Sequence, residues 1–249
     1  MKKHINDFIK ELLKLLKKIN QGTMGDSDCD RDSNCIEGSG AIIQETRTVM
    51  PFHTIVVKRR CQLLFEKSTR QNLRIEGDDN ILPLITTTVT EDGELTIDSR
   101  PRYHSASGIK VYAEMEEIKG FTIAGSAGIK SRDHFSSDAL TLTLSGSGKM
   151  ELGTGARTIS STITGSGSIS LAGEADSHNV LIAGSGDLTA PGLKAKKYNI
   201  TITGTGTCQV HVSASLKAVI TGSGSVRYQG SPPVVKSAVT GSGTVHPSS

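Results

Sequence analysis

The chain has 249 residues, with 28 Lys and Arg against 25 Asp and Glu and a formal net charge of +3. So small a surplus of positive charge does not provide a nucleic-acid-binding stripe. Aromatic residues make up 4% of the chain and tryptophan is absent, which does not suit a globular core of ordinary composition. The length permits one elongated domain or two ordinary ones.

Residues 1–20 carry apolar side chains at helical spacing between several lysines. The apolar positions are Ile5, Phe8, Ile9, Leu12, Leu13, Leu16 and Ile19. This pattern predicts a basic amphipathic helix. It would cap the following domain, associate with another copy, or contact an anionic membrane surface through residues 5–19. No apolar run exceeds two residues, so we expect neither an export signal nor a membrane span here.

Residues 21–35 are predicted to form a polar, acidic linker. Five carboxylates follow the spacing of a calcium-binding loop: Asp26, Asp28, Asp30, Asp32 and Glu37. However, Arg31 replaces the glycine that such a loop needs, and a strand pattern follows, so a solvated linker is favoured and no metal site is expected. Cys29 and Cys35 lie close enough in sequence for a small loop disulfide, if the compartment is oxidising.

Residues 36–120 have β-strand character without a fixed period. Cys61, Leu63 and Phe65 alternate on one face, and residues 86–90 and 95–98 flank a hairpin signal at residues 91–93. The tripeptide at residues 38–40 is Gly-Ser-Gly, with Ile36 and Ile42 on either side. We interpret it as an isolated early copy of the repeat described next.

The tripeptide Gly-Ser-Gly, or Gly-Thr-Gly, recurs through residues 121–249 at steps of 18 to 20 residues. The first glycines of successive copies are Gly146, Gly165, Gly184, Gly204, Gly222 and Gly241. A fixed period of this length indicates a solenoid, in which each repeat is one coil that cannot bury its apolar face alone.

The residues around each tripeptide alternate in character, as strand residues do. Two positions before the first glycine stand Leu144, Ile163, Ile182, Ile202, Ile220 and Val239. Four positions after it stand Met150, Ile169, Leu188, Cys208, Val226 and Val245. We expect both columns to point inward. The small residues directly before the glycine should point outward: Ser145, Thr164, Ala183, Thr203, Thr221 and Thr240.

Each coil is therefore predicted to run strand, glycine bend, strand and variable return loop, the loops lying at residues 173–178, 192–197 and 229–234. Glycine suits the bend because it reaches positive φ and lets neighbouring coils stack closely. A sandwich of antiparallel hairpins is the competing all-β architecture. It is less favoured because hairpins do not require one glycine motif at a constant period.

Candidate chemistry in the coils is sparse. The glycine motifs lack the third glycine of a dinucleotide-binding loop, and strands rather than helices follow them. A glycan-cleaving enzyme needs two carboxylates, and the coils offer only Glu151, Glu174, Asp176 and Asp187. His178 lies next to Asp176 in a predicted return loop, which we interpret as a solvated pair. We therefore assign no catalytic residue and no ligand-binding residue, and expect no cofactor or metal.

Several motifs occur in an order that resembles a known family. They are Glu45-Thr46-Arg47-Thr48-Val49, Pro51-Phe52, Ile55-Val56-Val57, the run from Arg74 to Pro83 and Ile109-Lys110-Val111-Tyr112. With the trailing repeats, residues 36–246 resemble the GIN-domain family of putative auto-transporter adhesin heads. The resemblance implies a right-handed parallel β-helix from a bacterial, often cell-envelope, protein with no assigned catalytic residues.

The sequence thus predicts an all-β protein: a right-handed parallel β-helix or solenoid with coils of about 19 residues over 36–249, preceded by an amphipathic helix. The function expected is non-catalytic adhesion or scaffolding at a bacterial cell envelope, through loops presented by a stiff rod. A surface protein or glycan would be the partner, and nucleic acid would not. A polysaccharide-binding or polysaccharide-cleaving β-helix is the alternative. No export signal is visible, so the compartment stays open.

Overall fold

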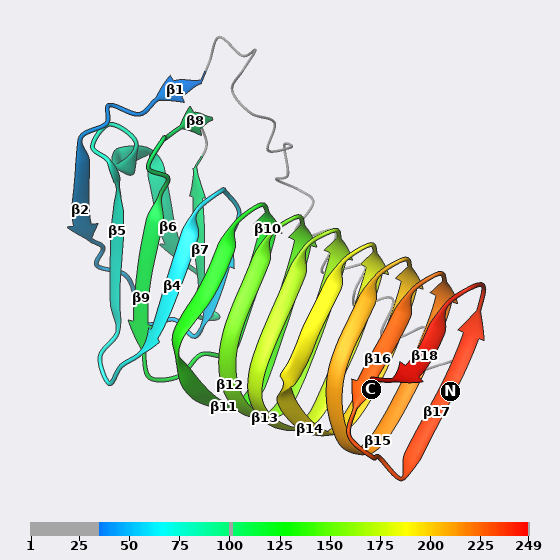
Figure 1. Ribbon diagram of the computed structural model, residues 1–249. Helices are drawn as coiled ribbons and strands as arrows, with labels where there is room; N and C mark the ends of the chain where they lie inside the picture. The colour runs from blue at the N-terminus through cyan, green and yellow to red at the C-terminus, as the bar shows by residue number, and fades with distance from the viewer. Residues whose placement is uncertain (1–34, 100–101, 249) are drawn as a thin grey trace.

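The computed structural model describes residues 35–99 and 102–248 (Figure 1). The predicted helix over residues 1–20 and most of the predicted linker lie outside these ranges. Within them the chain is all-β, and its one helical element is the single 3-10 turn η1 (Leu82–Leu84). The all-β prediction is confirmed.

The strands fall into a short irregular set and a long repeated set. The first set is β1 (Ile36–Glu37), β2 (Ile42–Thr46), β3 (Thr54–Val57), β4 (Gln62–Lys67), β5 (Asn72–Asp78), β6 (Ile85–Val89), β7 (Glu94–Ser99), β8 (Tyr103–His104), β9 (Lys110–Met115) and β10 (Gly120–Gly125). The second set is β11 (Gly128–Gly146), β12 (Lys149–Gly165), β13 (Ser168–Gly184), β14 (Asp187–Gly204), β15 (Thr207–Gly222), β16 (Ser225–Gln229), β17 (Val234–Thr240) and β18 (Thr244–Pro247).

The long strands β11 to β15 each run through almost a whole coil, from one glycine bend to the next. They pair in parallel, and the bends stay in register, as Gly146 with Gly165 and Gly165 with Gly184. The result is a β-solenoid of about seven turns with coils of about 19 residues. Parallel pairing at the repeat period excludes the antiparallel-hairpin alternative for this part of the chain.

Each coil doubles back on itself, so the solenoid has two walls. Residues 128–131 of β11 pair with β4, whereas residues 141–146 of the same strand pair with β10. We name the walls by their place relative to the glycine bend. The pre-bend wall holds β6, β7, β3, β10, the second halves of β11 to β15, and β17. The post-bend wall holds β2, β5, β9, β4, the first halves of β11 to β15, β16 and β18.

At its N-terminal end the solenoid does not follow chain order. Strand β3 pairs with β10 on one side and with β7 on the other, and β4 likewise lies between β11 and β9. The coil of β3 and β4 is therefore inserted between coils that come later in the sequence. Antiparallel strands β6, β5 and β2 complete this end. The hairpin predicted at residues 91–93 joins β6 to β7 as expected, with Gly93 at φ +70°.

The interior is a stack of aliphatic columns, as the alternation predicted. The residues two before and four after the first glycine are fully buried from β11 through β16. Three phenylalanines, Phe65, Phe121 and Phe135, meet edge to face where the irregular half joins the repeats, with ring centroids 5.1 to 6.3 Å apart. Only the last coil departs from the prediction: Val239 is 41% exposed because no described strand covers it.

Glycine is required at the bends for two measurable reasons. The first glycine of each repeat has φ between +114° and +123°, a region that residues with a side chain rarely adopt. In addition, a Cβ on Gly204 would lie 2.4 Å from the carbonyl oxygen of Gly184 in the preceding coil. The bend prediction is confirmed, and close stacking of the coils restricts the bend position to glycine as much as the backbone angle does.

Two of the three predicted return loops are wrong. Residues 173–178 lie inside β13 and residues 192–197 inside β14, where the two strands pair with each other. Their variable side chains are those on the outer face, while Ala175 and Ala195 point inward and are buried. Of the three, only residues 229–234 contain a true connection, between β16 and β17.

Candidate functional site

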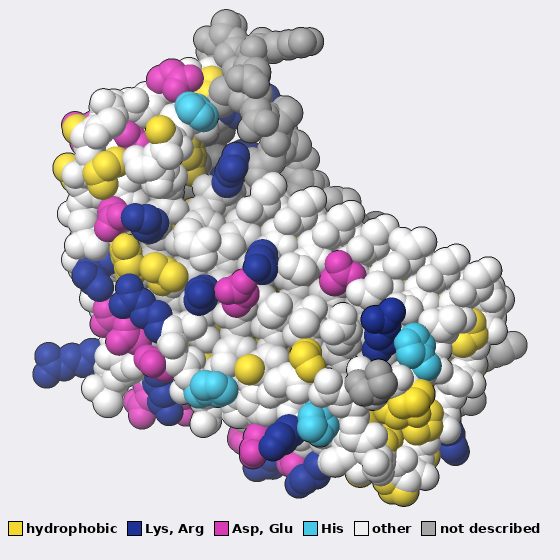
Figure 2. All heavy atoms as spheres, in the orientation of Figure 1, with side chains coloured by type: hydrophobic (Ala, Val, Ile, Leu, Met, Phe, Trp, Pro, Cys, Tyr) yellow, Lys and Arg dark blue, Asp and Glu magenta, His cyan; other side chains and the backbone are white. Residues whose placement is uncertain are grey.

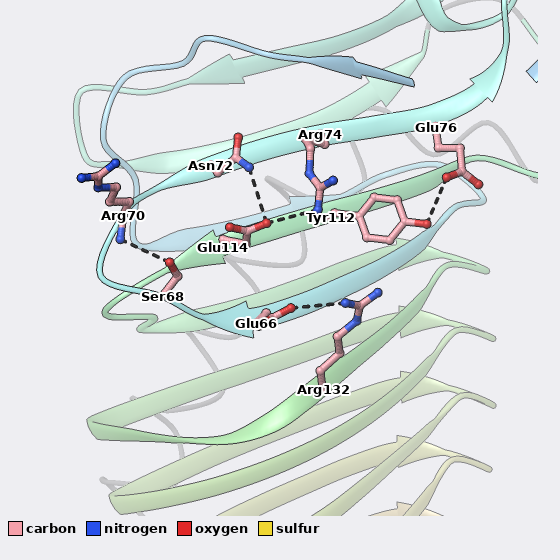
Figure 3. A network of polar contacts seen from close by, with 9 residues as sticks. All are labelled: Glu66, Ser68, Arg70, Asn72, Arg74, Glu76, Tyr112, Glu114 and Arg132. Carbon is pink, nitrogen blue, oxygen red and sulfur yellow. Dashed lines mark hydrogen bonds and ion pairs between the residues drawn. The ribbon is translucent and has the colours of Figure 1, made fainter. Parts of the chain in front are cut away.

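A network of charged side chains covers the outer face of the post-bend wall over β4, β5, β9 and β11 (Figure 3). Strand alternation places Arg74 and Glu76 of β5 on this face. Arg74 Nη2 lies 3.2 Å from Glu114 Oε1 of β9, and Lys110 Nζ lies 2.8 Å from Glu76 Oε1. These pairs cross between neighbouring strands, so the sheet register fixes them.

Tyr112 is at the centre of this network, and we call it with its neighbours the Tyr112 cluster. Its hydroxyl donates to Glu76 Oε2 over 3.2 Å. The guanidinium carbons of Arg74 and Arg132 lie 5.3 Å and 5.7 Å from the ring centroid, within the range of cation–π attraction. Arg132 Nη1 is also 3.3 Å from Glu66 Oε2. The ring is thus held in place, and two cations already lie over it.

Positive and negative side chains alternate across this region in the space-filling view, whereas the adjoining solenoid surface is mostly backbone and small polar side chains (Figure 2). The cluster therefore offers a fixed, mixed-charge surface for ionic and hydrogen-bonding contacts. It does not form a patch of one sign.

Four carboxyl groups of the described chain have a pKa shifted toward the ionised form. A hydrogen bond from Lys110 lowers the pKa of Glu76, although partial desolvation opposes it. The pKa moves the same way for three further carboxyls, through hydrogen bonds that each accepts: Asp78, Glu151 and Asp176. A glycosidase needs one carboxyl with a raised pKa to act as the general acid. The shifts seen here favour permanent charges.

The structure gives separate partners to three of the four acids considered for glycan cleavage. Asp176 is 2.7 Å from Lys196 Nζ, and Asp187 accepts a hydrogen bond from Thr207. The fourth acid, Glu174, is exposed on β13 and in register with Lys194. Glu151 contacts Lys149 and, at 3.5 Å, Lys130.

The interpretation of His178 as a solvated loop residue beside Asp176 is wrong. Its side chain points into the interior and is completely buried, while Asp176 faces outward. His178 Nε2 is 2.8 Å from the hydroxyl of Ser161, and the ring packs 5.1 Å from that of Tyr198. Burial lowers the pKa of His178 to about 3, so the imidazole is neutral.

The Ser161–His178 pair does not resemble a working nucleophile and base. Ser161 is 1% exposed and His178 is 0% exposed, so an outside substrate does not reach either group. His178 Nδ1 is buried without a hydrogen-bond partner, and a catalytic histidine needs a group there to orient it. The pair is a structural contact inside the stack.

A signal for this position was present in the sequence. His178 stands six residues before Gly184, an even number, and even positions point inward. The same position in the other coils holds Leu140, Ile159, Tyr198 and Leu216, which are in register and buried. Extending the alternation past the position two before the glycine would have predicted the burial.

The early tripeptide at residues 38–40 is not a copy of the solenoid bend. Asp78, nearly fully buried, accepts a hydrogen bond from Gly40 N over 2.7 Å and another from the Ser105 hydroxyl. Asn80 Oδ1 accepts from Ser39 N over 2.9 Å. The flanking Ile42 is exposed rather than interior. This turn fastens the first strands to the end of the fold.

Cysteine and metal chemistry add no reactive centre to the described residues. Cys61 and Cys208 are free and buried, and burial raises the pKa of Cys61 to about 12. Cys35 is disulfide-bonded, and Cys29, the partner considered from the sequence, lies outside the described residues. Residues 35–99 and 102–248 hold no group of three His, Cys, Asp or Glu that could bind a metal. Of the calcium-loop acids only Glu37 is described, and it lies 3.0 Å from His104 Nδ1. Nor does any helix in those ranges have the length and apolarity to cross a membrane.

A stack of parallel coils with an aliphatic interior and polar outer walls defines a β-solenoid module. The chain belongs to the family described as "putative auto-transporter adhesin, head GIN domain", whose model matches residues 51–232. This confirms the resemblance drawn from the sequence motifs. A comparison with curated proteins finds no match.

Solved structures share the fold at low sequence identity. A putative adhesin from Bacteroides fragilis is 22% identical with a TM-score of 0.81, over 86% of this chain and 100% of that one. A putative adhesin from Parabacteroides distasonis is 26% identical with a TM-score of 0.70, over 86% and 99%. A putative lipid binding protein from the same species is 21% identical with a TM-score of 0.73, over 86% and 99%.

Proposed function

We propose that this chain is a non-catalytic adhesion or scaffolding module of a bacterial cell envelope that binds its ligand with the outer wall of a stiff solenoid. Family membership supports the adhesin-like role. The observation that supports this contact surface is the Tyr112 cluster. There, ion pairs, a hydrogen bond and two cation–π contacts hold six side chains from four neighbouring strands: Glu66, Arg74, Glu76, Tyr112, Glu114 and Arg132.

Such a surface binds well for a general reason. Side chains that are already fixed lose little conformational entropy when a ligand arrives, and each immobilised flexible side chain would otherwise cost about 0.5–1.5 kcal/mol. The ligand would be a surface protein or glycan with charged and hydrogen-bonding groups. Wall residues, rather than the return loops expected from the sequence, would make the contacts. The coils are proposed to wind to the right, as about 98% of parallel crossover connections do.

Binding to arrays of envelope glycans and surface proteins, with lipid vesicles included because one structural neighbour is described as lipid binding, tests the proposal. We expect Tyr112→Ala and Arg132→Ala to weaken binding at least about tenfold, the effect of about 1.4 kcal/mol. Arg157→Ala is the matched control, since Arg157 also forms an exposed ion pair, with Asp138, away from the cluster.

Three results would count against the proposal. Equal losses for Arg132→Ala and Arg157→Ala would move the binding surface elsewhere. Release of reducing ends from a polysaccharide panel would favour the glycan-cleaving alternative. If fractionation of the native cells finds the protein away from the envelope, the proposed location is wrong.

A further inference from the structure

Strand β17 (Val234–Thr240) is the last described strand of the pre-bend wall. It pairs in parallel with β15, from Ser215 with Val234 to Thr221 with Thr240. No described strand pairs with its other side, and all seven of its residues are exposed. Figure 1 shows β17 at the far end of the rod, and Figure 2 shows hydrophobic side chains gathered at that end.

The backbone groups at the free edge can be identified from the repeat. Thr141, five residues before its glycine, donates its N–H to Lys119 O of the preceding coil over 2.9 Å. In a parallel ladder, the backbone groups of alternate residues point toward opposite neighbouring strands. Residues six, four and two before the glycine therefore point their N–H and C=O groups toward the following coil. In β17 these are Val235, Ser237 and Val239, whose N–H and C=O groups face the open side.

The side chains at the same positions end the interior columns. Val235 follows Leu216, and Val239 follows Ile220, both fully buried one coil earlier. Val235 is 42% exposed and Val239 41% exposed. Solenoids need a polar cap over such an end to stay soluble as single molecules. Here apolar side chains and unpaired backbone groups lie together on one edge.

The end of the other wall is different. In β18 (Thr244–Pro247), Thr244 N bonds to Gly224 O over 3.0 Å, and after the strand Ser248 N bonds to Tyr228 O over 2.8 Å. In a parallel ladder the alternate positions, Val245 and Pro247, therefore face the open side, where proline has no N–H to donate. A proline at a free edge blocks strand addition. Strand β17 has no such block.

Strand β17 is complementary to itself in one antiparallel register. Centred on Ser237, that register places Val235 opposite the partner's Val239 and Lys236 opposite the partner's Ala238. The only charge in the strand then avoids its own copy, and the apolar side chains meet on the inner side. A strand satisfies the open backbone groups, whereas a helix such as that predicted over residues 5–19 has already used its own.

We propose that two copies of this chain join end to end through β17, in antiparallel register centred on Ser237, to form a two-fold dimer. The pre-bend walls become one continuous sheet, and the aliphatic columns of the two solenoids cover each other. The dimer carries the two Tyr112 clusters toward opposite ends of a rod twice as long.

Disulfide trapping tests the register. In a hydrogen-bonded antiparallel pair the two Cα atoms are about 5.5 Å apart, inside the disulfide range of about 4.4–6.8 Å. Ser237→Cys should therefore give a covalent dimer on a non-reducing gel under mild oxidation. Ala238→Cys is the control, because its two copies are offset by two residues and lie beyond about 7 Å. The native Cys61 and Cys208 are buried and do not interfere.

Sedimentation of the unmodified chain tests the dimer itself. We expect a micromolar dissociation constant, so the dimer should predominate at a protein concentration of about 100 μM. Ser237→Pro removes an N–H that the monomer does not use, so its melting temperature should stay within about 2 °C while dimerisation weakens at least about tenfold. A chain that stays monomeric overturns the proposal. So does a dimer in which Ser237→Cys crosslinks no better than Ala238→Cys, or one that Ser237→Pro leaves intact in a folded protein.

Discussion

Acid should destabilise this solenoid through His178. The folded-state pKa of His178 is about 3, whereas a histidine in an unfolded chain has a pKa of about 6.5. The unfolded chain therefore binds the proton first as the pH falls. The contribution of His178 to stability is fully present above about pH 6.5 and is lost progressively between pH 6.5 and 3.

The size of the effect follows from the two pKa values. Each unit of difference corresponds to about 1.36 kcal/mol. Relative to pH 7, the free energy of unfolding should fall by about 2 kcal/mol at pH 5 and by about 3 kcal/mol at pH 4. That is a large part of the roughly 5–15 kcal/mol that stabilises a typical protein.

Denaturant unfolding at pH 7 and pH 5 measures this change. The variant Ser161→Ala/His178→Leu removes both members of the buried pair and continues the column with leucine, so it should lose about 2 kcal/mol less over that interval. The single change His178→Leu would leave the Ser161 hydroxyl unpaired in the interior, at a cost of about 1–3 kcal/mol.

The interval from pH 7 to 5 separates His178 from the carboxyl groups, whose ordinary pKa values lie near about 4. His134→Gln is the control, since His134 is exposed on the outer surface of β11. The reasoning is refuted if the double variant loses as much stability between pH 7 and pH 5 as the unmodified protein does.

Three further outcomes follow from the packing. Gly204→Ala should destabilise the fold by about 1–3 kcal/mol or more, through backbone strain and a clash with the preceding coil. Gly155→Ala, whose added Cβ meets nothing closer than 3.9 Å, should be near neutral. Equal melting temperatures for the two variants would contradict the bend geometry. Phe121→Ala opens a cavity in the phenylalanine cluster and should cost about 3–5 kcal/mol in denaturant unfolding, and a loss below about 1 kcal/mol would argue against tight packing there. Cys61 and Cys208 should resist alkylation in the folded protein and react once it is denatured, and rapid labelling of the native state would show that the stack opens.

The repeated half of the fold was predictable because its information is local and periodic. One glycine motif at a constant step fixed the coil length, and the columns beginning at Leu144 and Met150 identified the interior. The same logic failed at His178 only because the alternation was not followed through residues 173–178, where variable outward side chains suggested a loop.

The candidate site was not predictable in the same way. The Tyr112 cluster joins β4, β5, β9 and β11, whose residues come from positions 66 to 132 in the chain. Nothing periodic relates those strands, since β5 runs antiparallel to β9 while β4 runs parallel to it. Charged residues at alternate positions indicated only solvated strand faces.

By itself the sequence determined the parallel stacking of the coils, since each repeat carries the same inward columns and the same bend and can bury them only against its neighbours. The tertiary structure alone decided the insertion of β3 and β4 between later coils, the meeting of His178 with Ser161, and the exposure of β17 at the end of the rod. These features depend on the path of the chain between non-repeating strands and on where the stack stops. Neither is encoded in a local pattern, because each is fixed by which surfaces are left to be covered once the repeats have packed.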